Sequence, residues 1–405
     1  MSASSAEAVS LFIVAGEPSG DAIGARLMRA LRERAPEPLR FVGVGGEAMQ
    51  AEGLKVIFPM SDLSVMGIGE VLPRLPRILA RLEEATTAAV KLRPAAVITI
   101  DSSSFNKRLA RRLQSSGLPA LRIHYVAPMV WAWRPRRATK MAACFDHLLA
   151  LFPFEVEIFR AAGLPTTWTG HPLVETQPGE AASFRRRYGI DPGARVVCLL
   201  PGSRMTEVQR LLPAFREAVA RVEKAVGPVH TVVPTVETVG TAVEAALHAW
   251  PTDTTLIRGG IEKAAAFTAS DVALAASGSV TLELARAEVP MVVAYKTSGL
   301  TAFLARRLVK LPHISLVNIL AGEAVVPELL QGDCTPDLLA TELSRLLMDR
   351  GARDRQRAAF REICSGLAPV GELTPSQRAA DVVLGLAFAD TAPQTPASLH
   401  GEVTR

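Results

Sequence analysis

The amino-acid sequence predicts an α/β protein with two Rossmann-like, doubly wound domains that face each other across a cleft. Short β-branched runs alternate with longer segments of helical periodicity along the whole chain, as in folds built on parallel sheets. At about 150 residues per domain, the length of 405 residues fits two domains or three small ones. Hydrophobic residues make up 49% of the chain and charged residues 21%, which excludes a disordered protein and predicts sizeable cores.

The predicted elements follow one another in two similar series. In the first half, helices are expected at 22–34 and 76–92, and strands at 9–15, 40–44, 96–100, 120–126 and 147–151. In the second half, strands are expected at 196–200, 229–234, 254–258, 271–275 and 290–294, again with helical segments between them. Strands and helices at this spacing imply right-handed crossovers and a mostly parallel sheet in each half.

A segment rich in proline and glycine at 169–180 marks the boundary between the two halves. We therefore expect an N-terminal domain at 1–172, a linker at 173–185 and a C-terminal domain at 186–365. A helical segment at 366–389 is expected to pack back onto the fold. Residues 390–405 have the composition of a disordered tail.

Charge and cysteine usage narrow the function classes. The net charge of +5 comes without a block of five or six like charges, so it indicates an anionic substrate or a membrane surface rather than a nucleic-acid arm. The four cysteines are far apart and indicate reduced thiols of a cytosolic protein. The apolar run at 9–15 lacks the features of a signal peptide, and no run of about 18 apolar residues is present. The seven histidines have no metal-ligand spacing, so no metal is expected.

Candidate catalytic carboxylates follow two strands of the first half. Glu17 lies in a glycine-rich turn where the N–H groups of the next helix could hold an anion or sugar hydroxyls. A plain strand-to-helix turn capped by Ser19 or Asp21 fits the same residues. Asp101 ends the strand at 96–100, where a carboxylate could take a proton from an attacking hydroxyl. A cap for the following helix is the alternative there.

The strand predicted at 120–126 leads into a segment that is both aromatic and cationic. Trp131 and Trp133 lie beside Arg134 and two further arginines. Sugar rings stack on indoles and arginines hold phosphates with two hydrogen bonds, so an acceptor-binding wall is one interpretation. Ordinary packing between domains is the other.

Two strand ends of the second half have the features of a nucleotide-diphosphate site. Glycine permits close backbone approach, serine hydroxyls and helix N–H groups bind phosphate, arginine neutralises a leaving diphosphate, and a glutamate could accept from ribose hydroxyls. The residues are Gly202, Ser203 and Arg204 after one strand, and Ser277, Gly278, Ser279, Thr281 and Glu283 after another. The P-loop pattern is absent, and the glycines at 43–46 lack the third glycine of the dinucleotide fingerprint.

Together these blocks closely resemble the lipid-A-disaccharide synthase family, inverting glycosyltransferases of lipopolysaccharide biosynthesis. The similar segments are VAGEPSGD, FVGVGGEAMQAEG, LSVMGIGEVLPRLPRI, HYVAPMVWAW, LALFPFE, TGHPL, LLPGSR, SGSVTLE and SLVNILAGEAVVPELLQ. The resemblance implies a glycosyltransferase B fold without a cofactor or metal. It also implies UDP-2,3-diacylglucosamine as donor and 2,3-diacylglucosamine 1-phosphate as acceptor. The products would be the β(1→6)-linked lipid A disaccharide 1-phosphate and UDP.

The resemblance also suggests roles for single residues. Asp101 aligns with the family's proposed base, and Glu17 is the next candidate. Arg204 and the turn at 277–279 would carry the diphosphate and Glu283 the ribose, while Asn318 and Gln331 are carried over as donor contacts. The family usually reads IDAPDFN where this chain reads IDSSSFN, so Ser104 replaces the second aspartate.

An apolar series in the first half predicts contact with acyl chains or a membrane. Its members are Met66, Ile68, Val71, Leu72, Leu75, Leu79 and Leu82, with Arg74, Arg77 and Arg81 among them. Apolar contact combined with arginines is typical of peripheral membrane proteins, although a core-facing helix has the same spacing. Because of Pro73 and Pro76, we expect a loop through about Leu72 and a helix from one of these prolines. The segment at 300–311 is a weaker candidate.

The resulting hypothesis is a cytoplasmic enzyme, peripheral at the inner face of the inner membrane, with no nucleic-acid partner. Residues 1–172 would face the acceptor and the membrane, and residues 186–365 would bind the UDP-sugar. A homodimer is left open. The alternatives are a UDP-sugar 2-epimerase and a non-catalytic protein that binds a membrane surface.

Overall fold

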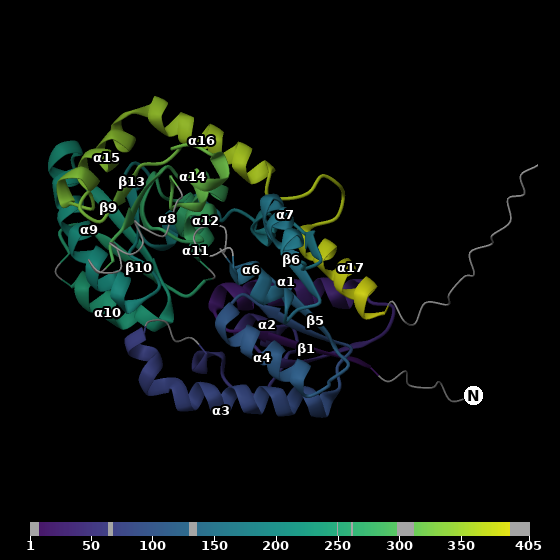
Figure 1. The fold of residues 1–405 in the computed structure, drawn as a ribbon. Coiled ribbons are helices and arrows are strands. Elements are labelled where there is room, and N and C mark those ends of the chain that lie inside the picture. Colours follow the sequence, from purple (N-terminus) through teal and green to yellow (C-terminus); the bar gives the residue numbers. More distant parts are fainter. Residues whose placement is uncertain are drawn as a thin grey trace, which may run out of the picture. The chain divides into compact units, whose positions relative to one another are not determined.

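The computed structural model describes residues 8–63, 68–128, 136–248, 250–260, 262–297 and 312–388 (Figure 1). The chain forms two compact units, each built on its own parallel sheet. Unit 1 contains Met1–Gly170 and Gly371–Arg405, and unit 2 contains His171–Val370.

Unit 1 holds a seven-stranded parallel sheet in the order β3-β2-β1-β4-β5-β6-β7. Its strands are β1 (Val9–Ala15), β2 (Leu39–Val44), β3 (Lys55–Val56), β4 (Ala96–Ile100), β5 (Leu121–Tyr125), β6 (His147–Ala150) and β7 (Thr166–Trp168). The chain builds outward from β1 through β2 to β3, and then returns to place β4 against the other side of β1. The topological switch point of this sheet therefore lies between β1 and β4.

The helices of unit 1 pack against this sheet. They are α1 (Pro18–Arg34), α2 (Glu47–Ala51), α3 (Ile68–Leu92), α4 (Ser103–Ser115), α6 (Arg136–Ala142), α7 (Pro153–Ala161) and α17 (Pro375–Ala387), with a 3-10 turn η1 (Met60–Asp62). The last of them, α17, lies against α1 although more than 300 residues separate them in sequence (Figure 1). Arg34 donates from Nη2 to Asp381 Oδ2 at 2.7 Å and links the two helices.

Helix α3 differs from the expected loop followed by a helix. It begins at Ile68 and continues through Pro73 and Pro76 to Leu92. From Leu82 onward one face of the helix is packed into the unit 1 core, and Leu82 is only 2% exposed. Burial of this face stabilises the helix more than two missing proline N–H groups near its beginning destabilise it.

Unit 2 holds a six-stranded parallel sheet in the order β10-β9-β8-β11-β12-β13. Its strands are β8 (Arg195–Leu200), β9 (Val229–Thr235), β10 (Thr254–Arg258), β11 (Val272–Ala276), β12 (Met291–Tyr295) and β13 (Glu328–Leu330). Its helices are α8 (Ala181–Arg187), α9 (Met205–Val226), α10 (Glu237–Leu247), α11 (Lys263–Thr268), α12 (Val280–Arg286), α14 (Leu316–Ala321), α15 (Pro336–Met348) and α16 (Arg350–Ser365), with a 3-10 turn η2 (Pro172–Glu175). The switch point lies between β8 and β11.

The two-unit α/β fold confirms the fold class predicted from the sequence. Each of the ten predicted strands is present, with ends that differ by no more than one residue. Three strands were not predicted, namely β3, β7 and β13, which are two or three residues long and lie at sheet edges. The segment at 173–185, expected as a linker, contains most of η2 and the start of α8, and Phe184 packs into a core cluster of unit 2.

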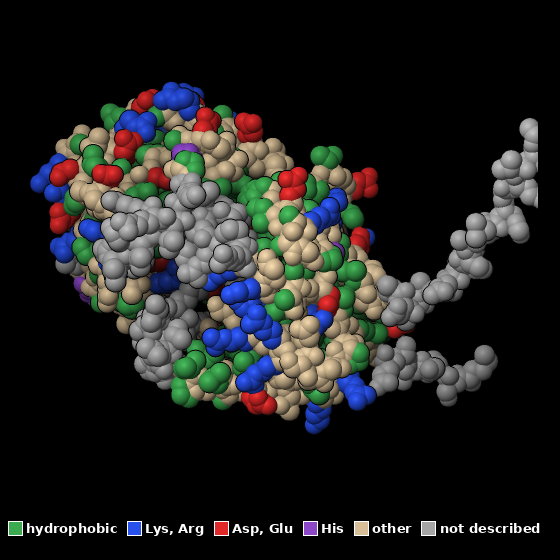
Figure 2. Space-filling view, viewed as in Figure 1, with side chains coloured by type: hydrophobic (Ala, Val, Ile, Leu, Met, Phe, Trp, Pro, Cys, Tyr) green, Lys and Arg blue, Asp and Glu red, His purple; other side chains and the backbone are tan. Residues whose placement is uncertain are grey.

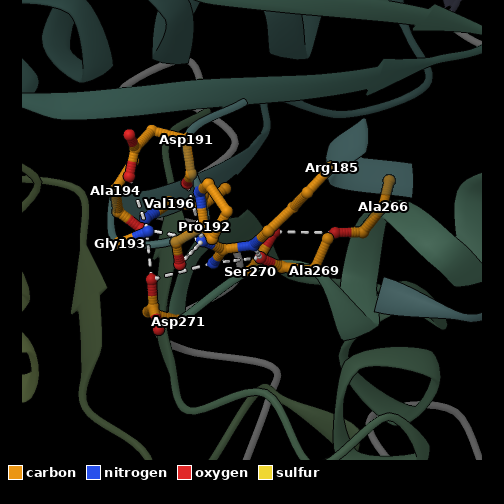
Figure 3. Close-up of polar contacts among 10 residues, drawn as sticks. All are labelled: Arg185, Asp191, Pro192, Gly193, Ala194, Val196, Ala266, Ala269, Ser270 and Asp271. Atoms are coloured by element: carbon orange, nitrogen blue, oxygen red, sulfur yellow. Dashed lines mark hydrogen bonds and ion pairs between the residues drawn. The ribbon is translucent and has the colours of Figure 1, made fainter. Parts of the chain in front are cut away.

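Arg185 ties together the amino ends of β8 and β11 (Figure 3). Its Nη2 donates to the Ala269 carbonyl at 2.8 Å, and its Nη1 donates to the Ala194 carbonyl at 3.0 Å. Asp271 Oδ2 accepts from the Val196 N–H at 2.7 Å and lies 3.4 Å from Arg185 Nη2. This network braces the edge of the sheet opposite to the carboxyl ends of the strands.

Candidate active site

The predicted catalytic carboxylates and the predicted diphosphate-binding segments lie at the switch points of the two sheets. In open parallel sheets, ligands bind outside the carboxyl ends of the strands where the strand order reverses. In unit 1 these are the loops after β1 and β4, which carry Glu17 and Asp101. In unit 2 they are the loops after β8 and β11, which carry the segments at 202–204 and 277–279. Each pair of strands is hydrogen-bonded side by side, so each pair of loops is adjacent.

The loops after β1 and β4 come into close contact. A Cβ atom on Gly16 would lie 2.4 Å from the Ser102 Oγ, so no larger residue fits there without movement. The next residue, Glu17, is the N-cap of α1 and is partly exposed, with Pro18 as the first helical residue. Glu17 and Asp101 therefore lie in neighbouring loops at the same edge of unit 1.

Asp101 lies in a strained turn. Its φ is 50° and that of Ser102 is 39°, so two successive non-glycine residues are left-handed. The Asp101 N–H donates to the Tyr125 carbonyl at 3.0 Å, which continues the sheet, and the Ser102 N–H donates to Asp101 Oδ1 at 2.8 Å. One carboxylate oxygen is thus held by the backbone of its own turn.

The side chain of Asn106 stabilises this turn through hydrogen bonds to its backbone, a role that the sequence did not reveal. Its Nδ2 donates to the Asp101 carbonyl at 2.7 Å and to the Ile100 carbonyl at 3.2 Å. The side chain is fully buried, and its Oδ1 has no hydrogen-bond partner among the described residues. Asn106 therefore fixes the backbone that carries the Asp101 carboxylate.

Asp21, one candidate for the cap of α1, caps a different helix. It is 7% exposed, and its carboxylate accepts from the N–H groups of Gly46 at 2.7 Å, Ala48 at 3.0 Å and Met49 at 3.1 Å. These N–H groups lie at the beginning of α2. Asp21 thus joins the glycine-rich turn after β1 to the turn after β2, and its role is structural.

His124 on β5 is a structural histidine. Its Nδ1 lies 2.8 Å from Thr99 Oγ1 on the neighbouring strand, and its ring stacks on Phe145 with centroids 4.8 Å apart. Complete burial lowers the pKa of this imidazole to about 3. The ring is therefore neutral at physiological pH.

In unit 2, the loop after β8 presents Arg204 at the carboxyl edge. Gly202 has a φ of +112°, and a Cβ atom there would lie 2.4 Å from Glu207 Oε2, so this position requires glycine. Ser203 and Arg204 are exposed, and Arg204 is the N-cap of α9. Arg204 Nη1 lies 3.0 Å from Glu207 Oε1, which orients the guanidinium while leaving it accessible to an anion.

In the turn after β11, two of the hydroxyl groups already form hydrogen bonds within the protein. Ser277 donates from Oγ to the Ile314 carbonyl at 3.1 Å, and buried Thr281 donates from Oγ1 to the Gly278 carbonyl at 2.8 Å. Gly278 and Ser279 are exposed, and the space around Gly278 is open. The backbone at Gly278 and the Ser279 hydroxyl are therefore the groups of this turn that a phosphate can reach.

Glu283 is paired with a lysine that the sequence did not indicate. Lys263 Nζ on α11 lies 2.7 Å from Glu283 Oε2 and 2.9 Å from Oε1. Both side chains are about one-third exposed, at 29% and 32%. The pair holds the carboxylate in place without burying it.

Asn318 and Gln331, the two weaker donor contacts, have different environments. Asn318 is fully buried, and its amide bonds to the N–H and carbonyl of Val326 and to Glu328 Oε1, each at 2.9 Å. The prediction of a direct donor contact is therefore not supported for Asn318, because these bonds occupy its amide. Gln331 is partly exposed at the end of β13 with a φ of 51°, and its Oε1 accepts from the Thr297 N–H at 3.2 Å.

Several predicted residues of the acceptor and membrane set fall outside the described residues. These are Met66, Trp131, Trp133 and Arg134. For Ile68, Val71 and Leu72 only the helical backbone is described, and Leu75 is partly buried. Within the described ranges no three metal-binding side chains cluster, and none of the helices there has the length and apolarity to cross a membrane.

Comparisons with known proteins agree with this geometry. The lipid-A-disaccharide synthetase family model matches residues 11–382. The lipid-A-disaccharide synthase of Rhodospirillum centenum is 46% identical over 392 residues, which cover 95% of this chain and 98% of that protein. Two solved structures share the fold at low identity. The glycotransferase of kitacinnamycin has a TM-score of 0.63 at 17% identity and covers 94% of this chain and 99% of its own. A UDP-GlcNAc 2-epimerase from Neisseria meningitidis has a TM-score of 0.60 at 11% identity, with coverages of 94% and 99%.

The two kinds of likeness carry different weight. Identities of 11% and 17% show the glycosyltransferase B type of fold, which the glycosyltransferase and the epimerase share, and do not separate the two activities. The family model covers most of the chain, and the relative is similar along its whole length. This chain therefore belongs to the lipid-A-disaccharide synthase family.

Proposed function

We propose that Asp101 is the general base with which this chain transfers a 2,3-diacylglucosaminyl group from UDP to the 6-hydroxyl of 2,3-diacylglucosamine 1-phosphate. The observation that carries the assignment is the position of Asp101. It directly follows β4 at the switch point of unit 1, on a strained turn that Asn106 holds in place. Strained backbone at such an edge is typical of preorganised functional groups.

The proposed chemistry needs two charge movements. Asp101 takes the proton of the acceptor hydroxyl while that oxygen forms a bond to the anomeric carbon of the donor. The bond from this carbon to the diphosphate oxygen breaks on the opposite face, and the electron pair leaves with UDP, so the configuration inverts. Glu17 lies in the neighbouring loop and is the second candidate for the base.

The leaving diphosphate would be held by unit 2. Arg204 and the exposed backbone and hydroxyl of Gly278 and Ser279 supply positive charge and donors at the carboxyl edge. Glu283, held by Lys263, would accept from the ribose hydroxyls. Arginine and backbone N–H groups thus replace a metal ion in neutralising the diphosphate.

A peripheral membrane contact through the beginning of α3 is also part of the proposal. Leu79 is 42% exposed, whereas Leu82 belongs to the core. Arg77 and Arg81 each lie 2.7 Å from an Asp62 carboxylate oxygen. These two arginines therefore attach η1 to α3, and we do not assign them to lipid headgroups. The members of the predicted apolar series before Leu82 are therefore the candidates for contact with acyl chains at the inner face of the inner membrane, whereas Ile78 packs against the core.

Membrane binding is tested with two variants at one helix. Leu79→Ser should reduce sedimentation with liposomes and leave the melting temperature nearly unchanged, because Leu79 already faces solvent. Leu82→Ala, the control, should lower the melting temperature through a core cavity. A triple variant that combines Leu79→Ser with Ile68→Ser and Leu72→Ser extends the test. If it sediments with liposomes as wild type does, a membrane contact at the beginning of α3 is contradicted.

The catalytic assignment is tested by incubating the protein with both acylated substrates and measuring UDP and disaccharide. Asp101→Asn should keep the fold and UDP affinity but lose about 10²–10⁴-fold in turnover, the usual contribution of a general base. Turnover close to wild type would move the base elsewhere, with Glu17→Gln as the next variant. Conversion of UDP-N-acetylglucosamine to its 2-epimer, without any disaccharide, would contradict the transferase function.

A further inference from the structure

Four cationic side chains converge between α4 and α6. Both helices contribute to one buried apolar cluster of unit 1, with Ala110 on α4 and Ala138 and Met141 on α6. Each helix adds two basic residues spaced three or four apart, which places them on one face. The cationic cluster consists of Lys107 and Arg111 on α4 and of Arg137 and Lys140 on α6. Figure 2 shows lysine and arginine side chains gathered over these helices in unit 1.

Cys144 connects the two sides of the cationic cluster. Arg111 Nε donates to Cys144 Sγ at 3.3 Å, and Cys144 Sγ donates to the Lys140 carbonyl at 3.1 Å. A thiol is a weak acceptor and does not neutralise the guanidinium. Arg111 is therefore positioned without losing its charge.

Other cations close to the cationic cluster are neutralised by carboxylates. On the same helix, Arg112 forms an ion pair with Glu83, and Arg122 on β5 pairs with Asp146 at 2.6 Å. Among the described residues, neither Lys107 nor Lys140 is ion-paired. Burial, followed by the charges of Arg111 and Arg137, lowers the pKa of the Lys107 ammonium.

Such an arrangement stabilises an anion more than it stabilises the fold. Like charges at this spacing repel one another, and partial burial of Lys107 strengthens the repulsion because less water screens it. A phosphate monoester carries about −1.5 to −2 charges near pH 7 and three acceptor oxygens, so it can satisfy several cations at once. Arg111 can donate two parallel hydrogen bonds to such a phosphate, and Lys107 and Lys140 can each donate one from an ammonium group.

The position of the cationic cluster relates this anion to the chemistry of unit 1. Helix α4 begins at Ser103, directly after the Asp101 turn. Lys107 follows four residues later, about 6 Å along the helix axis. An anion on the cationic cluster would thus lie close to the edge that carries Asp101.

We propose that the cationic cluster binds the phosphate monoester of the acceptor and so selects and orients the acceptor sugar. This inference rests on the proposed function, because it assumes that the acceptor is a sugar 1-phosphate whose hydroxyl reacts at Asp101. The residues assigned to the phosphate monoester are Lys107, Arg111 and Lys140, on α4 and α6. The charge of the phosphate monoester, rather than the acyl chains, is what these residues recognise.

The test measures each variant against an acceptor with and without its phosphate. The acceptors are 2,3-diacylglucosamine 1-phosphate and 2,3-diacylglucosamine, presented in neutral detergent micelles. Lys107→Gln and Arg111→Gln should each lower kcat/KM about tenfold or more for the phosphorylated acceptor, the loss of one charge-assisted hydrogen bond. Neither variant should change kcat/KM for the acceptor without phosphate or KM for the donor. Arg112→Gln, paired on the same helix, is the control and should behave as wild type.

The possible outcomes separate this inference from the proposed function. If wild type forms no disaccharide, the proposed function is wrong. If wild type forms disaccharide but the variants lose kcat/KM equally for both acceptors, the phosphate site is wrong. Loss of binding to vesicles that contain an anionic phospholipid, with equal effects on both acceptors, would make the cationic cluster a membrane contact and overturn the inference. The melting temperatures of Lys107→Gln and Arg111→Gln should equal or exceed that of wild type, since repulsion is removed.

Discussion

Asn106 provides the sharpest test of the strained turn, because it touches the backbone of Asp101 and not its carboxylate. Asn106→Leu keeps a buried side chain of similar size and removes both hydrogen bonds, at 2.7 Å to the Asp101 carbonyl and at 3.2 Å to the Ile100 carbonyl. The turn that loses them contains left-handed residues with φ values of 50° and 39°. Without Asn106 the backbone is free to move toward an unstrained conformation.

The magnitude follows from two opposing contributions. Left-handed Asp101 and Ser102 store about 1–2 kcal/mol each, and each lost hydrogen bond removes about 1 kcal/mol of net stabilisation. Because relaxation releases strain as the bonds disappear, the free energy of unfolding should fall by no more than about 2 kcal/mol. The carboxylate moves with its backbone, and a displacement of about 1 Å can lower a rate ~10²-fold. We expect kcat to fall about 100-fold and the donor KM to stay unchanged.

Steady-state kinetics and thermal unfolding of three variants test this reasoning. Thr99→Val, also on β4, loses its bond to His124 and should lose about 1 kcal/mol of stability with an unchanged kcat. Adding Ser102→Gly to Asn106→Leu should restore part of kcat, because glycine adopts the left-handed conformation without strain. A kcat within a few-fold of wild type in Asn106→Leu would refute the positioning role. So would a decrease that only follows the fraction of unfolded protein.

Three further variants address other parts of the molecule. Arg204→Ala should weaken UDP binding about tenfold or more in calorimetry, since one charge-assisted contact is lost; unchanged affinity would dismiss the loop after β8 as a diphosphate site. Arg185→Ala should lower the free energy of unfolding by about 1–3 kcal/mol, as it leaves carbonyls at the amino edge of unit 2 unsatisfied, with KM values unchanged. Unfolded His124 binds a proton below about pH 6.5 and folded His124 only below about 3, so stability should fall as the pH drops through this range. His124→Phe should flatten that dependence in denaturant titrations, and an unchanged slope would show that other groups cause it.

Most of the fold could be predicted because central parallel strands are buried on both faces and appear as continuous apolar runs. Strands such as β4 and β11 are completely buried, and their ends were predicted to within one residue. The edge strands β3 and β13 are too short and too exposed for such a pattern. The loops of the candidate site were found for the same reason, because polar residues directly follow buried strands.

What the sequence could not show was which polar side chains are already occupied. Asn318 and Asn106 are both buried asparagines in motifs, yet the first is fully bonded and the second keeps a buried oxygen without a partner among the described residues. The pairing of Glu283 with Lys263 joins residues 20 apart on two different helices. Such contacts depend on the tertiary packing of neighbouring loops, which periodicity does not encode.

Strained backbone in this fold is concentrated at the carboxyl ends of the strands, the edge of each sheet where the candidate site residues lie. Among the described residues, those outside glycine with a positive φ are Arg93, Asp101, Ser102, Val126, Glu288 and Gln331. Arg93 and Glu288 come just after helices, where a left-handed residue is an ordinary way to end a helix. The other four follow β4, β5 and β13 at carboxyl ends, where ending a strand requires no such conformation. Val126 is β-branched, for which this conformation is especially unfavourable. Strain that helix geometry does not require therefore coincides with the two edges where the acceptor and the donor are proposed to bind, as expected if the fold sacrifices stability there to hold reacting groups in place.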